Sequence, residues 1–412
     1  MRRQFHLVFG WMPALTAFVM PLHPRFTALT LAIWAIVAVS DELLGKLEHG
    51  RSAQARIGSM SAAGKWFARG GALMYALYGL GMLWSENTEA GWFALEVKFS
   101  MVLLPALMLH WAERKGAPGL HRTIPAFLLG LTILACWRAG SAFQAGTFEA
   151  WRYDELAGPF HPTYLGMYLA LSMLVNPLSG PWHKGLALVS GLFVGLLASK
   201  AAWMVAGGIW GLQWLRAVRK RQPRKLWWGG AIGMLLVGAL VGDGGRWSEF
   251  QSYVYPSTQL EPPVTKTSEG TAEALSPRPG KVGSSAGRVQ AWKAAAEVMT
   301  STPWGVGTGD VTDELCRKYR EHNAEYALKK RMNPHSVWLQ IGVSHGWLGL
   351  VMMVLWWGGT VRLAWKHRQW ILLLWCTIWI LNGTIESLLE LQQGVVPTMF
   401  LTLLLSTRSE QP

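Results

Sequence analysis

The chain has little charge for its length. Of its 412 residues, 15% are Asp, Glu, Lys or Arg, whereas 51% are apolar. Soluble domains carry about a quarter charged residues, so this composition excludes an ordinary water-soluble globule. It also excludes a disordered chain and a coiled coil, because both need many more charged residues. The composition therefore indicates a membrane protein.

Cysteine and metal-ligand patterns are scarce as well. The three cysteines, Cys136, Cys316 and Cys376, lie far apart and predict neither a disulfide framework nor a zinc cluster. No Asp-x-Asp pair occurs, and no spacing of His, Cys, Asp and Glu is typical of a metal site. The sequence therefore predicts no metal and no cofactor.

About twelve apolar runs follow one another along the chain. Several are shorter than the roughly 17 to 25 residues of a straight crossing, so their number is inferred together with the charges between them. They lie at about 5–21, 26–40, 72–84, 92–109, 123–137, 162–177, 185–198, 201–215, 226–242, 341–361, 369–381 and 395–406. We expect an all-α polytopic membrane protein with about 12 transmembrane helices, nine in residues 1–242 and three in residues 336–412.

The basic residues give the orientation. The formal net charge of +14 would suggest a nucleic-acid partner in a soluble protein. Here Lys and Arg gather in the segments that twelve crossings and two cytoplasmic termini place inside. A break at Ser199-Lys200 divides 185–215 into two crossings and keeps the basic cluster 216–225 inside. We therefore expect no nucleic-acid partner, but a multi-pass protein of the bacterial inner membrane.

Residues 243–335 form a long polar segment that the same count of crossings places in the periplasm. A loop of this length usually has its own structure and function. Its second half predicts a helix over Gly287–Thr300, a turn over Ser301–Gly309 and one amphipathic helix over Asp310–Arg331. Such a hairpin would lie over the mouth of the bundle, at the level of the lipid headgroups.

His335 stands where this loop enters the next helix. Asn333 is a good N-cap and Pro334 suits the first helical position, which predicts His335 in the first turn, at the outer surface. The positive end of the helix dipole disfavours an imidazolium there, so the neutral ring can accept a proton. The alternative is a histidine that only caps the helix or hydrogen-bonds at the interface.

Several motifs occur together in this order. Gly287-Arg288-Val289-Gln290-Ala291-Trp292 precedes Pro303-Trp304-Gly305-Val306-Gly307, and Asn333-Pro334-His335-Ser336 and Gly346-Trp347-Leu348-Gly349 follow. With His161-Pro162 and Glu390-Leu391-Gln392-Gln393-Gly394, they resemble the signature of the O-antigen ligase and polymerase superfamily. The resemblance covers about residues 150–405. It departs at Lys200, where members commonly have Arg, and at Ser336, where many have Asn.

The resemblance implies a GT-C-like glycosyltransferase. Its donor is a glycan on undecaprenyl pyrophosphate, and for a ligase the acceptor is a hydroxyl of the lipid A core oligosaccharide. Such a reaction needs a base and cations for the pyrophosphate, at the outer face of the bilayer. His335 is the expected base, and Arg288 and Lys200 are the expected pyrophosphate ligands. With these cations we expect metal-independent catalysis.

A second group of residues carries weaker expectations. Arg138 and Arg152 are further candidates for the pyrophosphate, although snorkelling to headgroups explains them more simply. Asn333, Gln340, His161 and Glu390 are candidate substrate-binding residues. Glu386 lies one turn before Glu390 if that stretch is helical, and either carboxylate can orient a cation or a sugar hydroxyl, or simply be solvated.

Two other functions stay open at this point. A polymerase shares the loop arginine and the outer histidine, and differs in that its acceptor is a further repeat unit. A transporter of lipid-linked glycans also suits twelve spans. Transporters, however, place charged sites near the membrane midplane and often repeat between halves, whereas these polar residues gather at the outer edge.

The predicted topology can be tested with reporter fusions after Arg221 and after Thr271. We expect the first to report the cytoplasm and the second the periplasm, since 226–242 is predicted to cross the membrane between them. Reports from the same compartment would contradict the division of 185–215 into two crossings.

Overall fold

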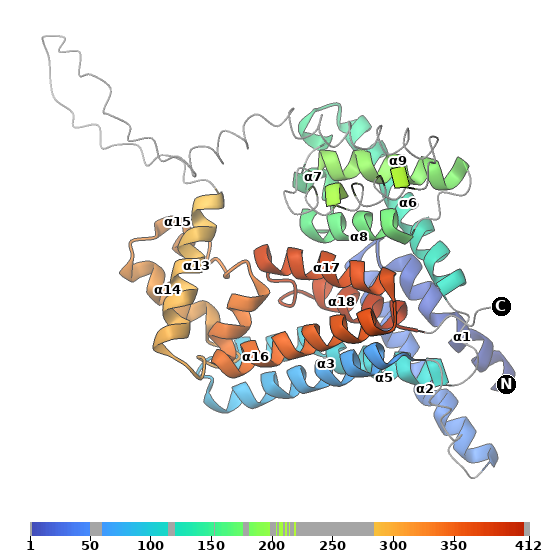
Figure 1. Ribbon diagram of the computed structural model, residues 1–412, viewed down its shortest axis with the longest axis horizontal. Helices are drawn as coiled ribbons and strands as arrows, with labels where there is room; N and C mark the ends of the chain where they lie inside the picture. The colour runs from blue at the N-terminus through green and yellow to red at the C-terminus, as the bar shows by residue number, and fades with distance from the viewer. Residues whose placement is uncertain are drawn as a thin grey trace, which may run out of the picture.

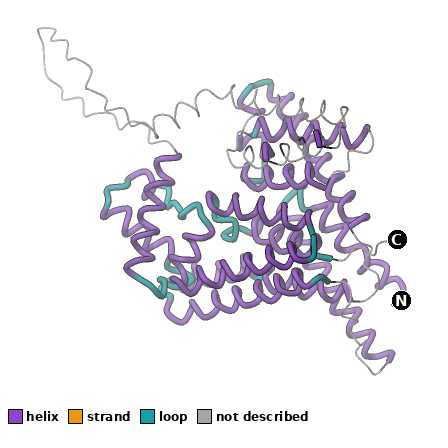
Figure 2. The backbone as a smooth tube through the Cα atoms, in the orientation of Figure 1, coloured by secondary structure: helices purple, strands orange, loops and turns teal. Residues whose placement is uncertain are grey.

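The computed structural model describes residues 2–49, 60–113, 120–151, 153–175, 181–197 and 284–407, with scattered residues between 203 and 219. In these ranges every regular element is a helix, apart from one antiparallel bridge between Met60 and Thr407. The predicted all-α fold is confirmed for this part of the chain (Figure 1, Figure 2).

The helices fall into an N-terminal and a C-terminal set. The first set is α1 (Arg2–Val19), α2 (Pro24–His49), α3 (Ala62–Gly81), α4 (Thr88–Lys98), α5 (Ser100–Glu113), α6 (Leu120–Ala145), α7 (Tyr153–Ala157), α8 (Pro162–Val175) and α9 (Pro181–Leu196). The second set is α13 (Ser284–Ser301), α14 (Val311–Glu321), α15 (Glu325–Lys329), α16 (Val337–Lys366), α17 (Trp370–Ile385) and α18 (Gln392–Leu405).

Four helical stretches are long and apolar enough to cross a membrane. They are Pro24–Leu43, Thr88–Ala112, Arg122–Ala145 and Val337–Lys366, and five shorter apolar helices accompany them. The chain is a polytopic membrane protein on this evidence. The number of twelve crossings stays a prediction, since the expected spans 201–215 and 226–242 lie mostly or wholly outside the described residues.

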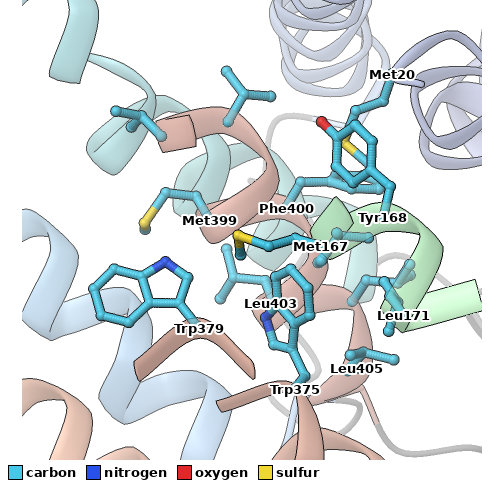
Figure 3. Packing of buried hydrophobic residues seen from close by; sticks show 14 of the residues in the cluster. Met20, Met167, Tyr168, Leu171, Trp375, Trp379, Met399, Phe400, Leu403 and Leu405 are labelled. Atoms are coloured by element: carbon cyan, nitrogen blue, oxygen red, sulfur yellow. The ribbon is translucent and has the colours of Figure 1, made fainter. Parts of the chain in front are cut away.

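Tryptophan side chains hold the middle of the bundle together. Trp375 and Trp379 on α17 donate their indole N–H groups to Thr402 and Thr398 on α18, over 2.9 and 2.7 Å. Figure 3 shows both indoles beside Met399 and Leu403 of α18. A buried indole N–H needs an acceptor, and hydroxyl groups supply it between apolar helices. These bonds fix α18 against α17 and so fix the segment that joins them.

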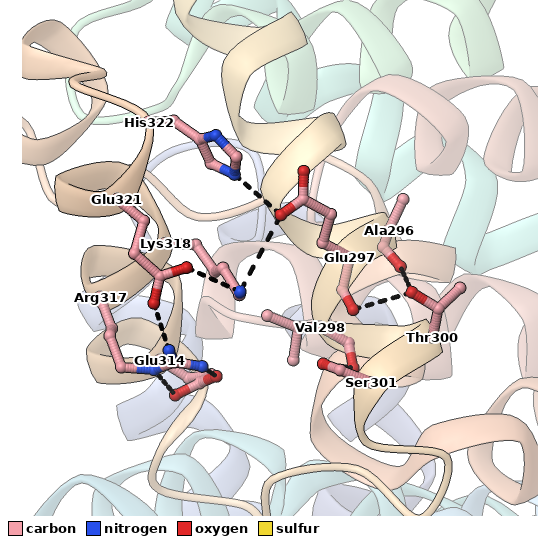
Figure 4. Close-up of polar contacts among 10 residues, drawn as sticks. All are labelled: Ala296, Glu297, Val298, Thr300, Ser301, Glu314, Arg317, Lys318, Glu321 and His322. Carbon is pink, nitrogen blue, oxygen red and sulfur yellow. Dashed lines mark hydrogen bonds and ion pairs between the residues drawn. The ribbon is translucent and has the colours of Figure 1, made fainter.

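The segment α13–α15, which we call the loop unit, has an apolar core of its own. Val298 of α13 and Leu315 and Tyr319 of α14 are buried in it, as the helical spacing of the last two predicts. Figure 4 shows Lys318 on α14 and His322, the C-cap of that helix, reaching Glu297 on α13 across the exposed face. Such surface pairs contribute little free energy, so the apolar contacts hold the unit together.

One of the helices predicted for the loop unit is wrong as a prediction, because the structure divides it in two. The expected helix Asp310–Arg331 ends at Glu321 and resumes as the short α15, because Asn323 adopts a left-handed φ of 51° that no helix continues through. The expected helix Gly287–Thr300 is confirmed as α13, and residues 302–310 form the expected turn.

The turn docks on a break in α16. Gly346 has φ 61° and ψ −153°, so Trp347 donates its N–H to Pro303 over 3.0 Å instead of to Val343. The carbonyls of Val343 and Ser344 accept instead from Val306 and Gly307, each over 2.9 Å. Buried backbone groups need partners, and the turn and the broken helix supply them to each other.

Substitution of Gly346 should separate these two segments. Gly346→Ala places a Cβ against the Pro303 carbonyl in a conformation open almost only to glycine, and we expect a loss of about 2 kcal/mol or more of stability. Gly358→Ala on the same helix is the control, because nothing lies within 4 Å of a Cβ there. Thermal unfolding of the purified proteins measures both, and equal midpoints would contradict the docking.

Candidate active site

Four segments bring charged side chains together around Glu386. Glu386 is the C-cap of α17 and is buried. Its Oε1 lies 3.2 Å from Nδ1 of His335, which precedes α16. Its Oε2 lies 3.7 Å from a guanidinium nitrogen of Arg288 on α13. The expected base and the expected loop cation thus share one carboxylate, and it is Glu386 and not Glu390 that joins them.

The backbone before α16 fixes the position of His335. Asn333 does not cap the helix as predicted: its Oδ1 accepts the N–H of His335 over 2.9 Å, and His335 adopts a left-handed φ of 44°. The N-cap is Ser336, whose own N–H donates to Ser387 Oγ over 3.1 Å. This contact with the α17–α18 segment decides where the helix begins, and it leaves His335 outside the helix, beside Glu386.

Glu386 is ionised in this environment. Burial by itself raises the pKa of its carboxyl, but the His335 hydrogen bond and the charges of His161, His335 and Arg288 outweigh burial and lower that pKa. A carboxylate only accepts hydrogen bonds, so Nδ1 of His335 carries the proton. When the ring is neutral, its lone pair is therefore on Nε2, which can accept a proton from another molecule.

His161 belongs to the same group of charges. It directly precedes α8, and its nearest charges include Glu386, Asp154, Arg288 and His335. Burial is the main cause that lowers the pKa of its imidazole, and it outweighs the charges of Glu386 and Asp154, which raise that pKa. His161 is therefore neutral near pH 7 and can donate or accept a hydrogen bond beside the cluster.

Glu390 pairs with a lysine that the sequence did not indicate. Lys98, at the end of α4, is 1% exposed, and its Nζ lies 3.1 Å from both carboxylate oxygens of Glu390. The same Nζ lies 4.7 Å from the centre of the Tyr78 ring. A lone lysine inside the apolar run 92–109 was the available signal, since such a residue is costly without a partner. The stretch from Glu386 to Glu390 is not helical, contrary to the expectation that placed them one turn apart.

The remaining candidates have separate surroundings. Arg138 donates to the carbonyls of Leu156 and Glu155 in α7, which is a structural use of its guanidinium. Gln340 is buried, and its Oε1 has no hydrogen-bond partner among the described residues. Lys200 and Arg152 lie outside the described residues. In the part of the chain that the structure describes, no three His, Cys, Asp or Glu side chains group as metal ligands do.

Comparison with known families tests the resemblance to the O-antigen ligase and polymerase superfamily. Residues 185–354, or 170 of 412, match the family model described as O-Antigen ligase. This match supports the O-antigen ligase-like superfamily for residues 185–354 of the chain. The resemblance drawn from its motifs is therefore confirmed. No curated protein matches the chain. The ligase match contains Arg288 and His335, whereas the fold brings Glu386 and His161 to them from outside it.

Members of this O-antigen ligase family are glycosyltransferase-like enzymes, both ligases and polymerases, that act on lipid-linked glycans at a membrane. The chain is an enzyme of that general class. The cluster around Glu386 has the composition that such chemistry needs: a base held by a carboxylate, and a guanidinium within reach.

Glu386→Gln tests whether the carboxylate serves His335. Removing its charge should lower glycan transfer by the purified enzyme at least about tenfold, because the tautomer and orientation of the ring are no longer fixed. The pKa of Glu386 is lowered from its ordinary value, so its carboxylate is ionised at pH 7 and the variant removes a full negative charge there.

The control for this variant is Glu321→Gln. Glu321 pairs with Arg317 and Lys318 on the exposed face of α14, and transfer should stay at the wild-type rate. Wild-type transfer by Glu386→Gln would show that His335 does not depend on this carboxylate.

Proposed function

We propose that this protein is an inner-membrane glycosyltransferase that moves O-antigen glycan from undecaprenyl pyrophosphate to a hydroxyl of the lipid A core oligosaccharide. Its active site faces the periplasm. The observation that supports this most directly is the contact of one buried carboxylate, Glu386, with both His335 and Arg288. That arrangement brings a candidate base and a cation to one place.

In the proposed reaction, Nε2 of His335 takes the proton of the acceptor hydroxyl. The hydroxyl oxygen then bonds to the anomeric carbon, the bond from that carbon to the pyrophosphate oxygen breaks, and the electron pair leaves with the pyrophosphate. Glu386 holds Nδ1 of the ring and stabilises the imidazolium that results. The contacts of Glu386 with His335 and Arg288 support these roles.

Arg288 is suited to the leaving group. Its side chain is 30% exposed, and 3.7 Å to Glu386 is too long for a hydrogen bond, so its N–H donors stay available. A guanidinium binds phosphate through two parallel bonds and remains charged at any physiological pH. Arg288 therefore holds the pyrophosphate and offsets the charge that develops as it departs. Lys200 is proposed as a second phosphate ligand.

Other residues complete the proposal. His161 is proposed to hydrogen-bond a sugar or a phosphate beside Glu386, and Asn333 positions His335 by accepting its N–H. Gln340, Glu390, Arg138 and Arg152 are proposed to contact substrate in subsidiary roles. Catalysis is proposed to need no metal, because arginine and lysine supply the positive charge at the pyrophosphate.

A polymerase is the second candidate, since the same base and cation would serve a carrier-linked acceptor. A transporter is disfavoured by the position of the cluster. His335, Glu386, His161 and Arg288 all lie at helix ends or between helices, not in the middle of spans. We favour the ligase because the pattern from Arg288 to His335 looks closer to ligases.

Reconstitution tests the proposal. The purified protein receives undecaprenyl-pyrophosphate glycan, with and without core lipid A and without added metal. A ligase gives one shift of the core lipid and needs that lipid. A ladder formed from carrier-linked units alone would show a polymerase, and loss of transfer on chelation, restored by a divalent cation, would contradict metal-free catalysis.

His335→Ala should lower the rate in this assay by about 10² or more, the usual contribution of general base catalysis. The control is His322→Ala, which removes an exposed histidine that pairs with Glu297 on the loop unit and should leave transfer unchanged. Near-normal transfer by purified His335→Ala would remove His335 from the mechanism.

A further inference from the structure

Large apolar side chains lie exposed around the break in α16. They come from the α3–α4 connection, the second turn of α4, the turn 302–309 and the residue after Gly346. We call this set the tryptophan patch: Leu83, Trp84, Trp92, Phe93, Trp304 and Trp347. In a soluble protein a set of large exposed apolar side chains on neighbouring segments would indicate a docking surface.

Backbone contacts hold the segments of the patch together. Trp347 donates its N–H to Pro303, the neighbour of Trp304, over 3.0 Å. The Asp310 carboxylate accepts the N–H groups of Glu86 and Asn87 over 2.9 and 2.7 Å. The α3–α4 connection, the turn and α16 therefore form one rigid surface, and Trp304 has a fixed place on it.

Trp304 stands apart from the rest of the loop unit. It is 77% exposed, and it is the only large apolar side chain among the described residues 284–336 that is exposed. Val298, Met299, Leu315 and Tyr319 of this stretch pack into the core of the loop unit instead. The Trp304 indole is therefore available for contact with a molecule outside the protein.

The patch continues the lipid-facing surface of α16. After Trp347, exposed Val351, Val354 and Leu355 follow along the helix, and Trp365 lies exposed near its end. Residues 347–366 span about 30 Å at 1.5 Å per residue, the thickness of a hydrocarbon core. Exposed tryptophans at both ends of such a stretch are typical of the two membrane interfaces.

A polar surface adjoins the other side of the patch. An open hollow of about 630 Å³ is lined by Trp84 together with Glu86, Asp313, Arg317 and other charged residues. Charged side chains favour contact of this hollow with water, whereas the exposed apolar side chains of α16 favour contact with lipid. The tryptophan patch lies where the two meet.

We propose that the tryptophan patch is a membrane-interface anchor whose partner is the outer-leaflet lipid. Trp304 inserts among the headgroups and the upper acyl chains, so the loop unit is attached to the bilayer through the turn as well as to α16. This inference uses no part of the proposed chemistry and holds for a ligase and a polymerase alike.

A fluorescent probe at position 304 tests the anchor. The full chain carries Trp304→Cys in a Cys136→Ala background, since Cys136 is exposed whereas Cys316 and Cys376 are buried. It is labelled with bimane in nanodiscs of phosphatidylethanolamine and phosphatidylglycerol. A phospholipid with a nitroxide near its headgroup should lower the emission at least about twofold, and aqueous iodide should have little effect.

The control probe is Lys329→Cys, at an exposed position of α15 in the same loop unit, where iodide should quench and the lipid nitroxide should not. Equal iodide quenching at both positions would place Trp304 in water and overturn the proposal. Quenching by neither agent would show that protein, and not lipid, covers position 304, and would overturn the proposal as well. If the Trp304→Cys protein does not fold, Trp92→Cys is labelled and probed in its place. Neither measurement depends on glycan transfer.

Discussion

The exchange of backbone hydrogen bonds between the 302–309 turn and α16 is the constraint on which the site depends. The break at Gly346 leaves buried backbone carbonyls of α16 without their usual partners in the helix. In a membrane protein such carbonyls need hydrogen-bond donors from another segment. Val306 and Gly307 are those donors, and through them the loop unit is held at one position on the bundle. Arg288 on α13 reaches Glu386 on that account, because α13 ends directly before this turn.

Glu386 is the second point of convergence. Its carboxylate is buried, which is costly without compensation, and three segments compensate it with two histidines and an arginine. The indole–hydroxyl bonds between α17 and α18 fix the segment that carries it. The cluster around Glu386 is therefore positioned by the packing of α17 against α18 and by the backbone hydrogen bonds between the 302–309 turn and α16.

Much of this arrangement was predictable from the sequence, and the exceptions have physical causes. Helical periodicity located α13 and two of the buried positions of α14, Leu315 and Tyr319, and the motifs predicted Arg288 and His335 on one side of the membrane. The start of α16 was not predictable, because Ser336 bonds to Ser387, 51 residues away. Lys98 and Glu390 were missed as a pair for the same reason, since no local pattern joins side chains that are 292 residues apart.

The place of Glu386 in the chain has a consequence for biosynthesis. Arg288 and His335 leave the ribosome well before the carboxylate that orders them, since Glu386 follows α17 and precedes the last helix described. A nascent chain that stops short of α17 contains the whole matched segment and both of these residues, yet no group that fixes the imidazole tautomer. Under the proposed mechanism, a chain that has not yet reached Glu386 therefore holds His335 without the carboxylate that orients it.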